Sequence, residues 1–572
     1  MQDRRKDLTA RKFDILVIGA GMFGACIAWS ATLRGYSVAV IDKGDFANAT
    51  SSNHYKFIHG GIRYLQHLDL IRLRESSREK SALIRIAPHL AYPLPIVFPT
   101  YGHGRRGKAI MRAAMLAYDV LTLDRNRGIK DSTRRTPNGS VLGREQVIQM
   151  FPGIPTSKLT GAAVFYDGQM YNSARLVLAF LRSAASRDAI VTNYVNADQL
   201  IREKDEIVGC TATDGLSGNQ FQIRARLVIN AAGPWGHLLL QDDAALTLRP
   251  EPSFSRDLAF VVNKSVCATH AIGCQSASTD ADAILDRGGR HLFLVPWRGM
   301  TLIGVWHRYS LAHPDNITVS RAELQQYIDE INAAYTGLDL CIDDITMVNT
   351  GHILFGPESA QGSENEHSFA KRSLLIDHAK NNIDGLITVV GARATVARGV
   401  AEKTMDLAQR KLAEKVTRSN TDRERIHGGH FDNFAVLVDE IRQQLPTDGQ
   451  QAATAIAHNY GSDYQEVLDC AADPTLLDAL GSSHVIGAEI VHAIRFEMAK
   501  SLTDIVLRRT ELGSGGDPGN AAVQQAAKIA GKEFGWDAQE MADQVRSVQQ
   551  ILQQGGPWNF VDHLTQTEAD ST

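Results

Sequence analysis

The stretch FDILVIGAGMFGACIAWSATLRGYSVAVID, residues 13–42, decides the fold. It opens with a short β-branched apolar run, residues 13–19, which is typical of a buried parallel strand. A helical pattern over 22–34 follows, and a second strand runs from Ser37 to Ile41. This order predicts a βαβ unit, the building block of a parallel sheet.

The turn between that strand and that helix has the spacing Gly19-x-Gly21-x-x-Gly24, and Asp42 ends the next strand. The glycines permit a tight turn, close backbone approach to a pyrophosphate and tight helix packing. The helix N-terminus then offers free N–H groups to the phosphates, and Asp42 can accept from the ribose hydroxyls. We therefore predict a dinucleotide site. The alternative is a structural glycine turn in an ordinary βαβ unit.

The length and composition of the chain indicate the number of domains and the general class of the protein. A chain of 572 residues predicts two or three domains. The net charge of −4 gives no sign of a nucleic-acid partner. The six cysteines form no CxxC pair, which fits a reducing cytoplasm, and we expect no metal site. The N-terminus lacks a signal-peptide pattern, and no apolar run is long enough for a transmembrane helix.

The rest of the chain alternates between sheet and helix patterns. Residues 160–240 predict a helix, a hairpin over 206–224 and a buried strand. Residues 256–310 predict antiparallel sheet with a turn at Arg298-Gly299. Residues 385–410 repeat the order strand, glycine turn and helix. Beyond Gly428 the pattern is helical, with one long helix expected over 487–508.

The two strand–turn–helix units lie far apart in the sequence, at Gly19 and at Gly391. An NAD domain usually continues with further short βαβ units, whereas this chain runs from Asp42 into ATSS (49–52) and IHGGIRY (58–64). A ligand contacted by both ends of the body must be long and extended. We therefore predict FAD, bound non-covalently.

Several blocks carry a family resemblance. They are ATSSNHYKFIHGGIRYLQ (49–66), RIAPHLAYPLPIVFP (85–99), Asp167 with ARLVL (174–178), INAAGPW (229–235), FLVPW (293–297) and DIVLRRT (504–510). Together they resemble the FAD-dependent glycerol-3-phosphate dehydrogenase family, within the D-amino-acid-oxidase superfamily. The similarity covers almost the whole chain, and the 49–99 block is the most specific part.

The resemblance implies a mixed α/β (α+β) fold: a Rossmann-like FAD-binding domain, an antiparallel-sheet substrate domain and a C-terminal all-helical domain. The oxidoreductase body would span 1–425. Its FAD-binding parts would be about 13–100, 160–240 and 370–415, and its substrate parts about 101–159 and 241–369. The helical domain would span 426–572, after the polar run near 420–430.

The resemblance also implies the site residues. The expected FAD contacts are Gly19, Gly21, Met22, Phe23, Gly24, Asp42, Lys43, Thr50, Ser51, Ser52, His59, Gly60, Gly61, Val195, Ala232, Gly233, Trp235, Gly391, Arg393, Ala394 and Thr395. The candidate catalytic and substrate-binding residues are His59, Arg63, Tyr64, His307, His352 and Arg393.

This chain departs from the family pattern on the substrate side. The family's Gly-Gly-Lys block reads GARAT (391–395), and its Gly-x-Arg-Pro block is replaced in TGHIL (350–354). The Gly-Thr-Thr-Asp stretch becomes GVWH (304–307), and the Lys-Gly-Ser-His stretch becomes RDLA (256–259). The FAD blocks stay intact, so these changes predict a remodelled pocket. Arg63 and Arg393 could still bind an anion, and His307 or His352 could supply a base.

We therefore expect an enzyme that moves a hydride from a small anionic alcohol, other than glycerol 3-phosphate, to flavin N5. Glycerol-3-phosphate dehydrogenase activity itself stays open. Further alternatives are an oxidase or dehydrogenase of an amine, an amino acid or a 2-hydroxy acid, and a non-catalytic flavoprotein. The electron acceptor would be a quinone or oxygen, and a homodimer is left open.

The expected location is cytoplasmic, with peripheral contact to the inner membrane face as a hypothesis. An apolar run, Ala113 to Leu123, has basic residues on both sides: Arg105, Arg106, Lys108 and Arg112 before it, and Arg125, Arg127 and Lys130 after it. Such a stretch can lie in the headgroup region. The alternative is a core helix with solvated flanks.

Overall fold

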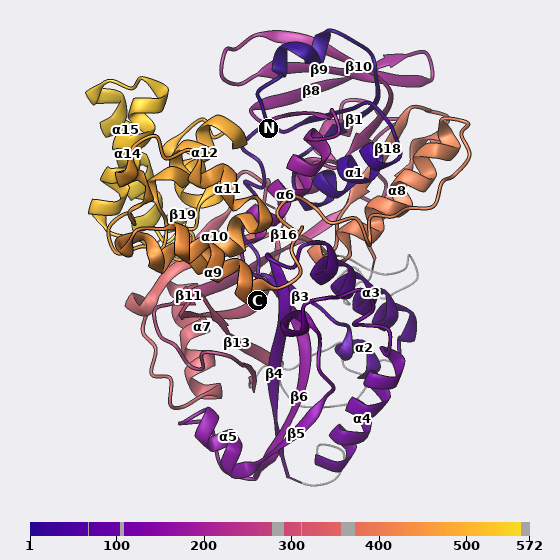
Figure 1. Ribbon diagram of the computed structural model, residues 1–572. Coiled ribbons are helices and arrows are strands. Elements are labelled where there is room, and N and C mark those ends of the chain that lie inside the picture. The colour runs from indigo at the N-terminus through magenta and orange to yellow at the C-terminus, as the bar shows by residue number, and fades with distance from the viewer. Residues whose placement is uncertain are drawn as a thin grey trace.

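The computed structural model describes residues 1–66, 68–102, 108–276, 291–310, 312–355, 372–556 and 558–561. Figure 1 shows three parts: a first sheet with helices packed on it, a second sheet below it, and a group of C-terminal helices at one side. This arrangement confirms the predicted mixed fold class.

The first sheet grows from the βαβ unit. Its order is β17-β18-β10-β1-β2-β7, and all neighbours except the edge strand β17 are parallel. The strands are β1 (Phe13–Ile18), β2 (Val38–Ile41), β7 (Ile190–Thr192), β10 (Gln220–Asn230), β17 (Leu374–Asp377) and β18 (Leu386–Val390). Three helices share one apolar core with this sheet: α1 (Met22–Leu33), α6 (Ser173–Ala185) and α8 (Ala397–Lys411). β9 (Glu206–Asp214) pairs with the first part of β10 as the hairpin predicted over 206–224, and β8 (Val195–Glu203) pairs with β9.

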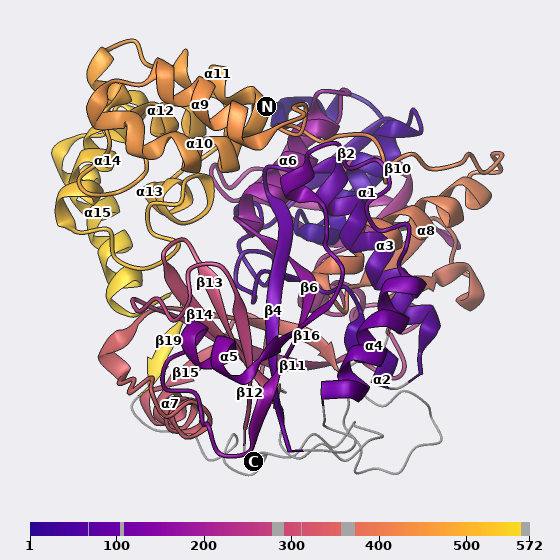
Figure 2. The same cartoon turned by 60° about the horizontal axis from the view of Figure 1, so that its bottom comes forward.

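The second sheet has the order β16-β11-β14-β13-β12-β4-β6-β3, with β5 beside β6. Its strands are β3 (Phe57–Ile58), β4 (Ala91–Tyr101), β5 (Ser140–Gly143), β6 (Leu159–Met170), β11 (Ser253–Val262), β12 (Ala271–Gln275), β13 (His291–Trp297), β14 (Met300–Ser310) and β16 (Ile345–Phe355). In Figure 2 the long strand β4 crosses the body, with α2 (Ile62–Gln66), α3 (Leu70–Ile86) and α4 (Lys108–Leu121) on one side. α5 (Arg144–Met150) and α7 (Arg321–Ala334) complete this part.

The second sheet draws strands from both expected parts of the body. β3, β4 and most of β6 fall in segments that we assigned to the FAD-binding part, yet they pair in the second sheet. The chain crosses between the two sheets several times, and strand periodicity does not say which sheet a strand joins.

The C-terminal part is helical, as predicted, but one long helix expected in it is interrupted. It contains α9 (Phe434–Gln444), α10 (Ala453–Tyr460), α11 (Tyr464–Leu468), α12 (Gly487–Glu497), α13 (Leu502–Asp504), α14 (Asn520–Phe534) and α15 (Ala538–Gln553). The single helix expected over 487–508 is wrong. It breaks at Met498, which has a φ of 59°, and Ser501 then caps α13 by accepting from the Asp504 N–H. Serine is a preferred residue at the N-cap position of a helix. The spacing of the apolar residues, by contrast, does not indicate that the helix breaks here.

Two buried ion clusters attach these helices to the body. Asp45, in the loop after β2, accepts from Arg508 Nε at 2.6 Å and from Arg509 Nη1 and Nη2 at 2.7 and 2.6 Å. Glu497 accepts from Arg175 and Arg182 of α6 at 2.5 and 2.9 Å. Beyond the helices, β19 (Asn559–Val561) pairs with β15 (Thr318–Ser320) in a separate two-stranded sheet. The C-terminal helices also share an apolar core with strands of the second sheet. The C-terminal part is therefore attached to both main sheets.

Candidate active site

A single cavity of about 1530 Å³ lies between the two sheets. Its wall combines the loops after β1 and β2 with strands of the second sheet. Small-molecule pockets usually measure about 300–1,000 Å³. The cavity is thus large enough for an extended cofactor together with a second, smaller ligand.

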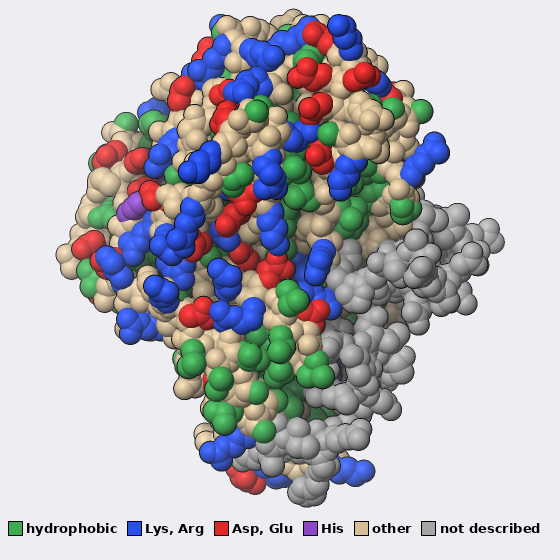
Figure 3. Space-filling view, turned by 90° about the vertical axis from the view of Figure 1, so that its right-hand side faces the viewer, with side chains coloured by type: hydrophobic (Ala, Val, Ile, Leu, Met, Phe, Trp, Pro, Cys, Tyr) green, Lys and Arg blue, Asp and Glu red, His purple; other side chains and the backbone are tan. Residues whose placement is uncertain are grey.

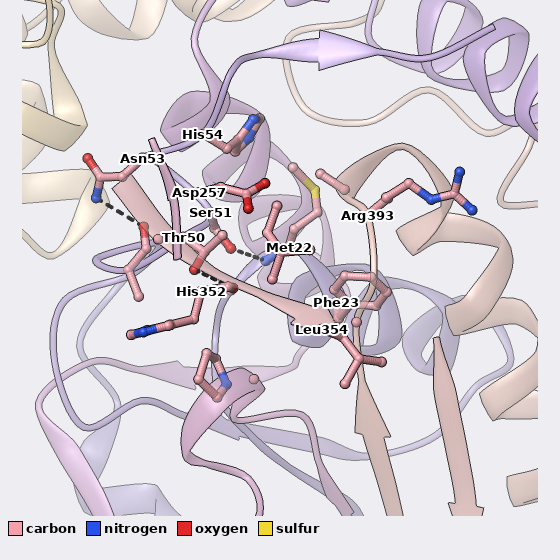
Figure 4. Close-up of a pocket in the computed structure, with 18 of the residues that line it drawn as sticks. Met22, Phe23, Thr50, Ser51, Asn53, His54, Asp257, His352, Leu354 and Arg393 are labelled. Carbon is pink, nitrogen blue, oxygen red and sulfur yellow. Dashed lines mark hydrogen bonds between the residues drawn. The ribbon is translucent and has the colours of Figure 1, made fainter. Parts of the chain in front are cut away.

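The glycine turn forms one end of this cavity. Gly19 has a φ of 102°, and a Cβ there would lie 2.6 Å from the Ala231 carbonyl oxygen. A Cβ at Gly24 would lie 1.8 Å from the Gly19 oxygen, so Gly24 is needed for the turn itself. Gly21 differs, because its Cβ would meet only the Ser51 hydroxyl and would otherwise face the cavity. The N–H of Met22 donates to Ser51 Oγ at 2.9 Å, as Figure 4 shows.

Asp42 lies beside this turn. Its carboxylate accepts from the N–H groups of Ala20 and Gly44 at 2.7 and 3.0 Å, and burial raises its pKa to about 6. Farther out, the Lys43 ammonium lies 4.4 Å from the Trp235 ring centre, and both side chains contact the Asp315 carboxylate. These groups form the wall where an adenosine would lie.

The second glycine turn packs against the first. A Cβ at Gly391 would lie 2.0 Å from the Phe23 ring, so this position closes the cavity over the first turn. Thr395 Oγ1 accepts from the His59 N–H at 3.0 Å. The IHGG loop and the Gly391 turn are therefore fixed to each other, although they are far apart in sequence.

The two glycine turns, the acid after β2 and the large cavity that they border fit FAD. Of the expected FAD contacts, all but three line the cavity. Gly24 lies beneath the turn. Ser52 directs its hydroxyl to the Ala49 carbonyl, and the Gly60 N–H donates to Asp167 Oδ1 at 2.7 Å. These three residues support the cavity wall and do not line it. The spacing of residues in the sequence does not distinguish a lining residue from a supporting one.

Of the catalytic candidates, the cavity brings together His59, Tyr64, His307, His352 and Arg393. The side chain of Arg63 lies outside the described residues. In Figure 4 Arg393 and His352 lie on opposite sides of the cavity. The candidates therefore divide into one group around Arg393 and another on the second sheet.

The Arg393 group contains Arg393, Arg72 and Tyr64, which all line the cavity. The guanidinium carbons of Arg393 and Arg72 lie 5.3 and 4.8 Å from the centre of the Tyr64 ring. Burial lowers the pKa of Arg393. A buried guanidinium gains most from a negatively charged ligand, because the ligand offsets the cost of desolvation.

On the second sheet, His307 and Asp257 face each other across β14 and β11, and both line the cavity. His307 Nδ1 lies 2.8 Å from Asp257 Oδ1, which also accepts from Ser255 Oγ at 2.9 Å. A carboxylate at Nδ1 fixes the ring and leaves Nε2 as the atom that can accept a proton. Sequence reasoning named His307 but missed Asp257 as its partner, although the RDLA block contains it.

His352 is in a different environment. Its Nε2 lies 3.2 Å from Ser310 Oγ, and its backbone oxygen accepts from Thr50 Oγ1 at 3.1 Å. Burial lowers the pKa of His352 to about 4, with a further contribution from Arg256. His352 is therefore a weak base near neutral pH.

Sequence reasoning also missed two buried donors on the cavity wall. His54 Nδ1 accepts from the Lys56 N–H at 2.9 Å, and burial lowers the pKa of His54 to about 3. The ring is then neutral, and its proton is on Nε2. That atom and Asn349 Nδ2 have no hydrogen-bond partner within the described residues. Both fit a ligand that presents acceptor oxygens, as flavin does.

The comparisons with known proteins agree with this geometry. A family model described as FAD dependent oxidoreductase matches residues 14–393. The chain belongs to this family. The model for the C-terminal domain of alpha-glycerophosphate oxidase matches residues 419–541.

The chain is similar to glycerol-3-phosphate dehydrogenases over nearly its whole length. It is 28% identical to the enzyme of Synechocystis sp., covering 95% of this chain and 96% of the relative. It is 28% identical to the human mitochondrial enzyme, covering 95% and 73%. The FAD-bound glycerol-3-phosphate dehydrogenase of Bacillus halodurans shares its fold, at a TM-score of 0.73 and 21% identity over 96% and 97% of the two chains.

The protein is thus an FAD-dependent oxidoreductase related to glycerol-3-phosphate dehydrogenases, and FAD is its cofactor. These matches support the dehydrogenase prediction over the amine, amino-acid and non-catalytic alternatives. Within the described part of the chain, no helix has both the length and the apolar character to span a bilayer.

Proposed function

We propose that this protein oxidises a small anionic alcohol other than glycerol 3-phosphate. One observation carries the proposal. The four blocks that depart from the family pattern all contribute to the cavity wall, through Asp257, His307, His352 and Arg393. The FAD blocks keep their residues and line the same cavity. Selective change on the substrate side fits a new substrate better than a loss of function.

The reaction removes a hydride from the alcohol carbon and a proton from its oxygen, which leaves a carbonyl. FAD, when bound, supplies the hydride acceptor. Arg393, which is half-buried, would bind the anionic group of the substrate beside Tyr64. A buried arginine can bind a carboxylate or a phosphate with two parallel hydrogen bonds.

His307 would accept the hydroxyl proton at Nε2. Asp257, at Nδ1, would hold the required tautomer and stabilise the positive charge that develops on the ring. His352 is the weaker candidate, because its lowered pKa opposes protonation. His59, whose Nδ1 lies 3.7 Å from Asp167 Oδ2, would line the site beside the flavin.

Glycerol 3-phosphate tests the substrate proposal directly. We expect the FAD-loaded protein to oxidise it well below about 10 per second, the ordinary rate of an enzyme on its own substrate. The measurement is dye reduction at saturating glycerol 3-phosphate. A rate of about 10 per second or more would show that the altered blocks still serve the family's reaction.

The proposed base is tested by replacing it. His307→Asn should slow flavin reduction by the best available anionic alcohol by about 100- to 10,000-fold, the usual contribution of general base catalysis. Stopped-flow absorbance gives the rate, and the flavin spectrum confirms that FAD occupancy is unchanged. His352→Asn should cause a much smaller loss. If the two variants exchanged these effects, His352 would be the base.

We also propose contact with an anionic membrane surface, where a quinone acceptor would be available. Leu116 and Val120 on α4, with Leu123 after it, are 66%, 58% and 78% exposed, and Leu68 and Ile71 near the start of α3 are 80% and 74% exposed. Figure 3 shows hydrophobic side chains gathered on this face, with Lys and Arg nearby. Arg105 and Arg106 lie outside the described residues. Exposed apolar side chains beside basic ones suit the headgroup region of anionic lipid.

Liposomes test this contact. The protein should co-sediment with vesicles that contain phosphatidylglycerol at low salt, and less so at high salt. Leu116→Asp with Val120→Asp should abolish sedimentation and leave dye-linked activity unchanged. Equal sedimentation of both proteins, or none of either, would contradict the proposal. A shift of the double variant to a smaller species in gel filtration would instead identify the apolar face as a dimer interface.

A further inference from the structure

We infer that the substrate carries an aromatic ring next to its anionic group. This inference rests on the proposed function and adds the class of substrate. The altered sequence blocks do not by themselves point to a ring. The evidence is a set of aromatic side chains on the cavity wall, of which only His59 has a role in the steps above.

The set is a column of stacked rings beside the Arg393 group. Tyr55 stacks on Phe57 with ring centres 5.2 Å apart and an interplanar angle of 3°, and Phe57 stacks on His59 at 5.5 Å and 26°. Phe293 of β13 lies 6.0 Å from Phe57 at a tilt of 52°. All four rings line the cavity. We call this group the ring wall.

The ring wall is fixed in place by the second sheet. Tyr55 Oη donates to the Phe293 carbonyl oxygen, which ties the column to β13. A Cβ at Gly304 would lie 3.4 Å from the Tyr55 ring, so the ring packs directly on β14. Ile96 and Phe165, which are paired across β4 and β6, continue the apolar wall. Rigid rings cost little entropy when a ligand binds to them.

The position of the ring wall assigns it to the substrate rather than to the adenosine or the phosphates. The turns that hold the nucleotide end belong to the first sheet, whereas Phe293, Ile96 and Phe165 belong to the second. His59 links the ring wall to the Arg393 group, because its N–H donates to Thr395 two residues after Arg393. The anion site and the ring wall are therefore neighbours in one cavity.

A three-carbon phosphate has almost no apolar surface to bury, so it gains nothing from such a wall. An aromatic ring presents its negative face to the positive edges of stacked rings, an arrangement that adds to the gain from burial. The geometry therefore points to an aryl-substituted anionic alcohol, such as an aryl 2-hydroxy acid or an arylalkyl phosphate that also carries a hydroxyl group.

The test compares matched anions on the FAD-loaded protein by calorimetry: phenylacetate with acetate, and phenyl phosphate with methyl phosphate. We expect the aryl anion of at least one pair to bind about 10- to 100-fold more tightly, as burial of a ring predicts. Phe57→Leu and Phe293→Leu should each reduce that ratio by about 3- to 10-fold, with FAD occupancy unchanged. Phe260→Leu is the control, because this buried ring stacks on Trp306 and does not line the cavity.

Equal affinities within both pairs would overturn the inference. So would loss of FAD from the ring-wall variants, since the rings would then serve the cofactor. Flavin bleaching by 3-phenyllactate and lactate separates this inference from the proposed function. Reduction at equal kcat/KM by both alcohols would refute the inference and leave the proposed function standing. A different result would refute the proposed function and keep the ring site. In that case the aryl anions bind more tightly, but the flavin is reduced by none of 3-phenyllactate, lactate and glycerol 3-phosphate.

Discussion

Gly21→Val is expected to give a folded protein that binds no FAD. The glycine faces the cavity, and a Cβ there would meet only the Ser51 hydroxyl at 2.9 Å. The added valine would instead occupy the space through which a pyrophosphate approaches the N-terminus of α1. The purified variant should lack the flavin absorbance band while its far-ultraviolet circular dichroism matches that of the unchanged protein.

A neighbouring glycine supplies the contrast. Gly24→Ala places its Cβ 1.8 Å from the Gly19 carbonyl oxygen, which neither backbone can accommodate. That variant should lose soluble expression or unfold at a markedly lower temperature. A Gly21→Val protein with full FAD occupancy would mean that the cofactor does not approach this turn.

Arg509→Leu is expected to lower the free energy of unfolding by about 3–5 kcal/mol, the usual effect of removing one partner of a buried ion pair. Arg509 is fully buried and donates to both oxygens of Asp45, which is also inaccessible to solvent. Although burial opposes the charge, the two arginines beside Asp45 hold the pKa of that carboxyl well below its usual range. Removing one arginine leaves a buried negative charge only partly compensated.

Chemical denaturation with circular dichroism measures this loss. Arg546→Leu is the control, since its pair with Asp543 is exposed, at 70% and 51%, and should leave the unfolding midpoint unchanged. If Arg509→Leu unfolded at the same denaturant concentration as the control variant, Asp45 would not depend on this arginine. FAD release should accompany the loss of stability, because Asp45 lies in the loop that follows Asp42.

The nucleotide end of the site was predictable because its signals are local. The strand, the glycine spacing and Asp42 lie within one short stretch, and the structure has them in that order. The second turn at Gly391 was also visible, since it repeats the same order of elements.

The substrate end was less predictable because it forms from distant segments. Asp257 meets His307 only through the register of β11 with β14. The ring wall depends on the hydrogen bond from Tyr55 to the Phe293 carbonyl oxygen, and no local sequence pattern predicts this contact. The break at Met498 was missed because the apolar spacing continues through it: Met498, Leu502 and Ile505 are buried as a continuous helix would bury them.

The pairing of Asp45 with Arg508 and Arg509 also sets an order of events during synthesis. Asp45 leaves the ribosome 463 and 464 residues before the two arginines that neutralise it. Until then the loop next to the ribose position contains an uncompensated carboxylate and is not fixed. FAD capture is therefore expected to follow translation of the C-terminal helices, so truncated chains would accumulate as colourless apoprotein.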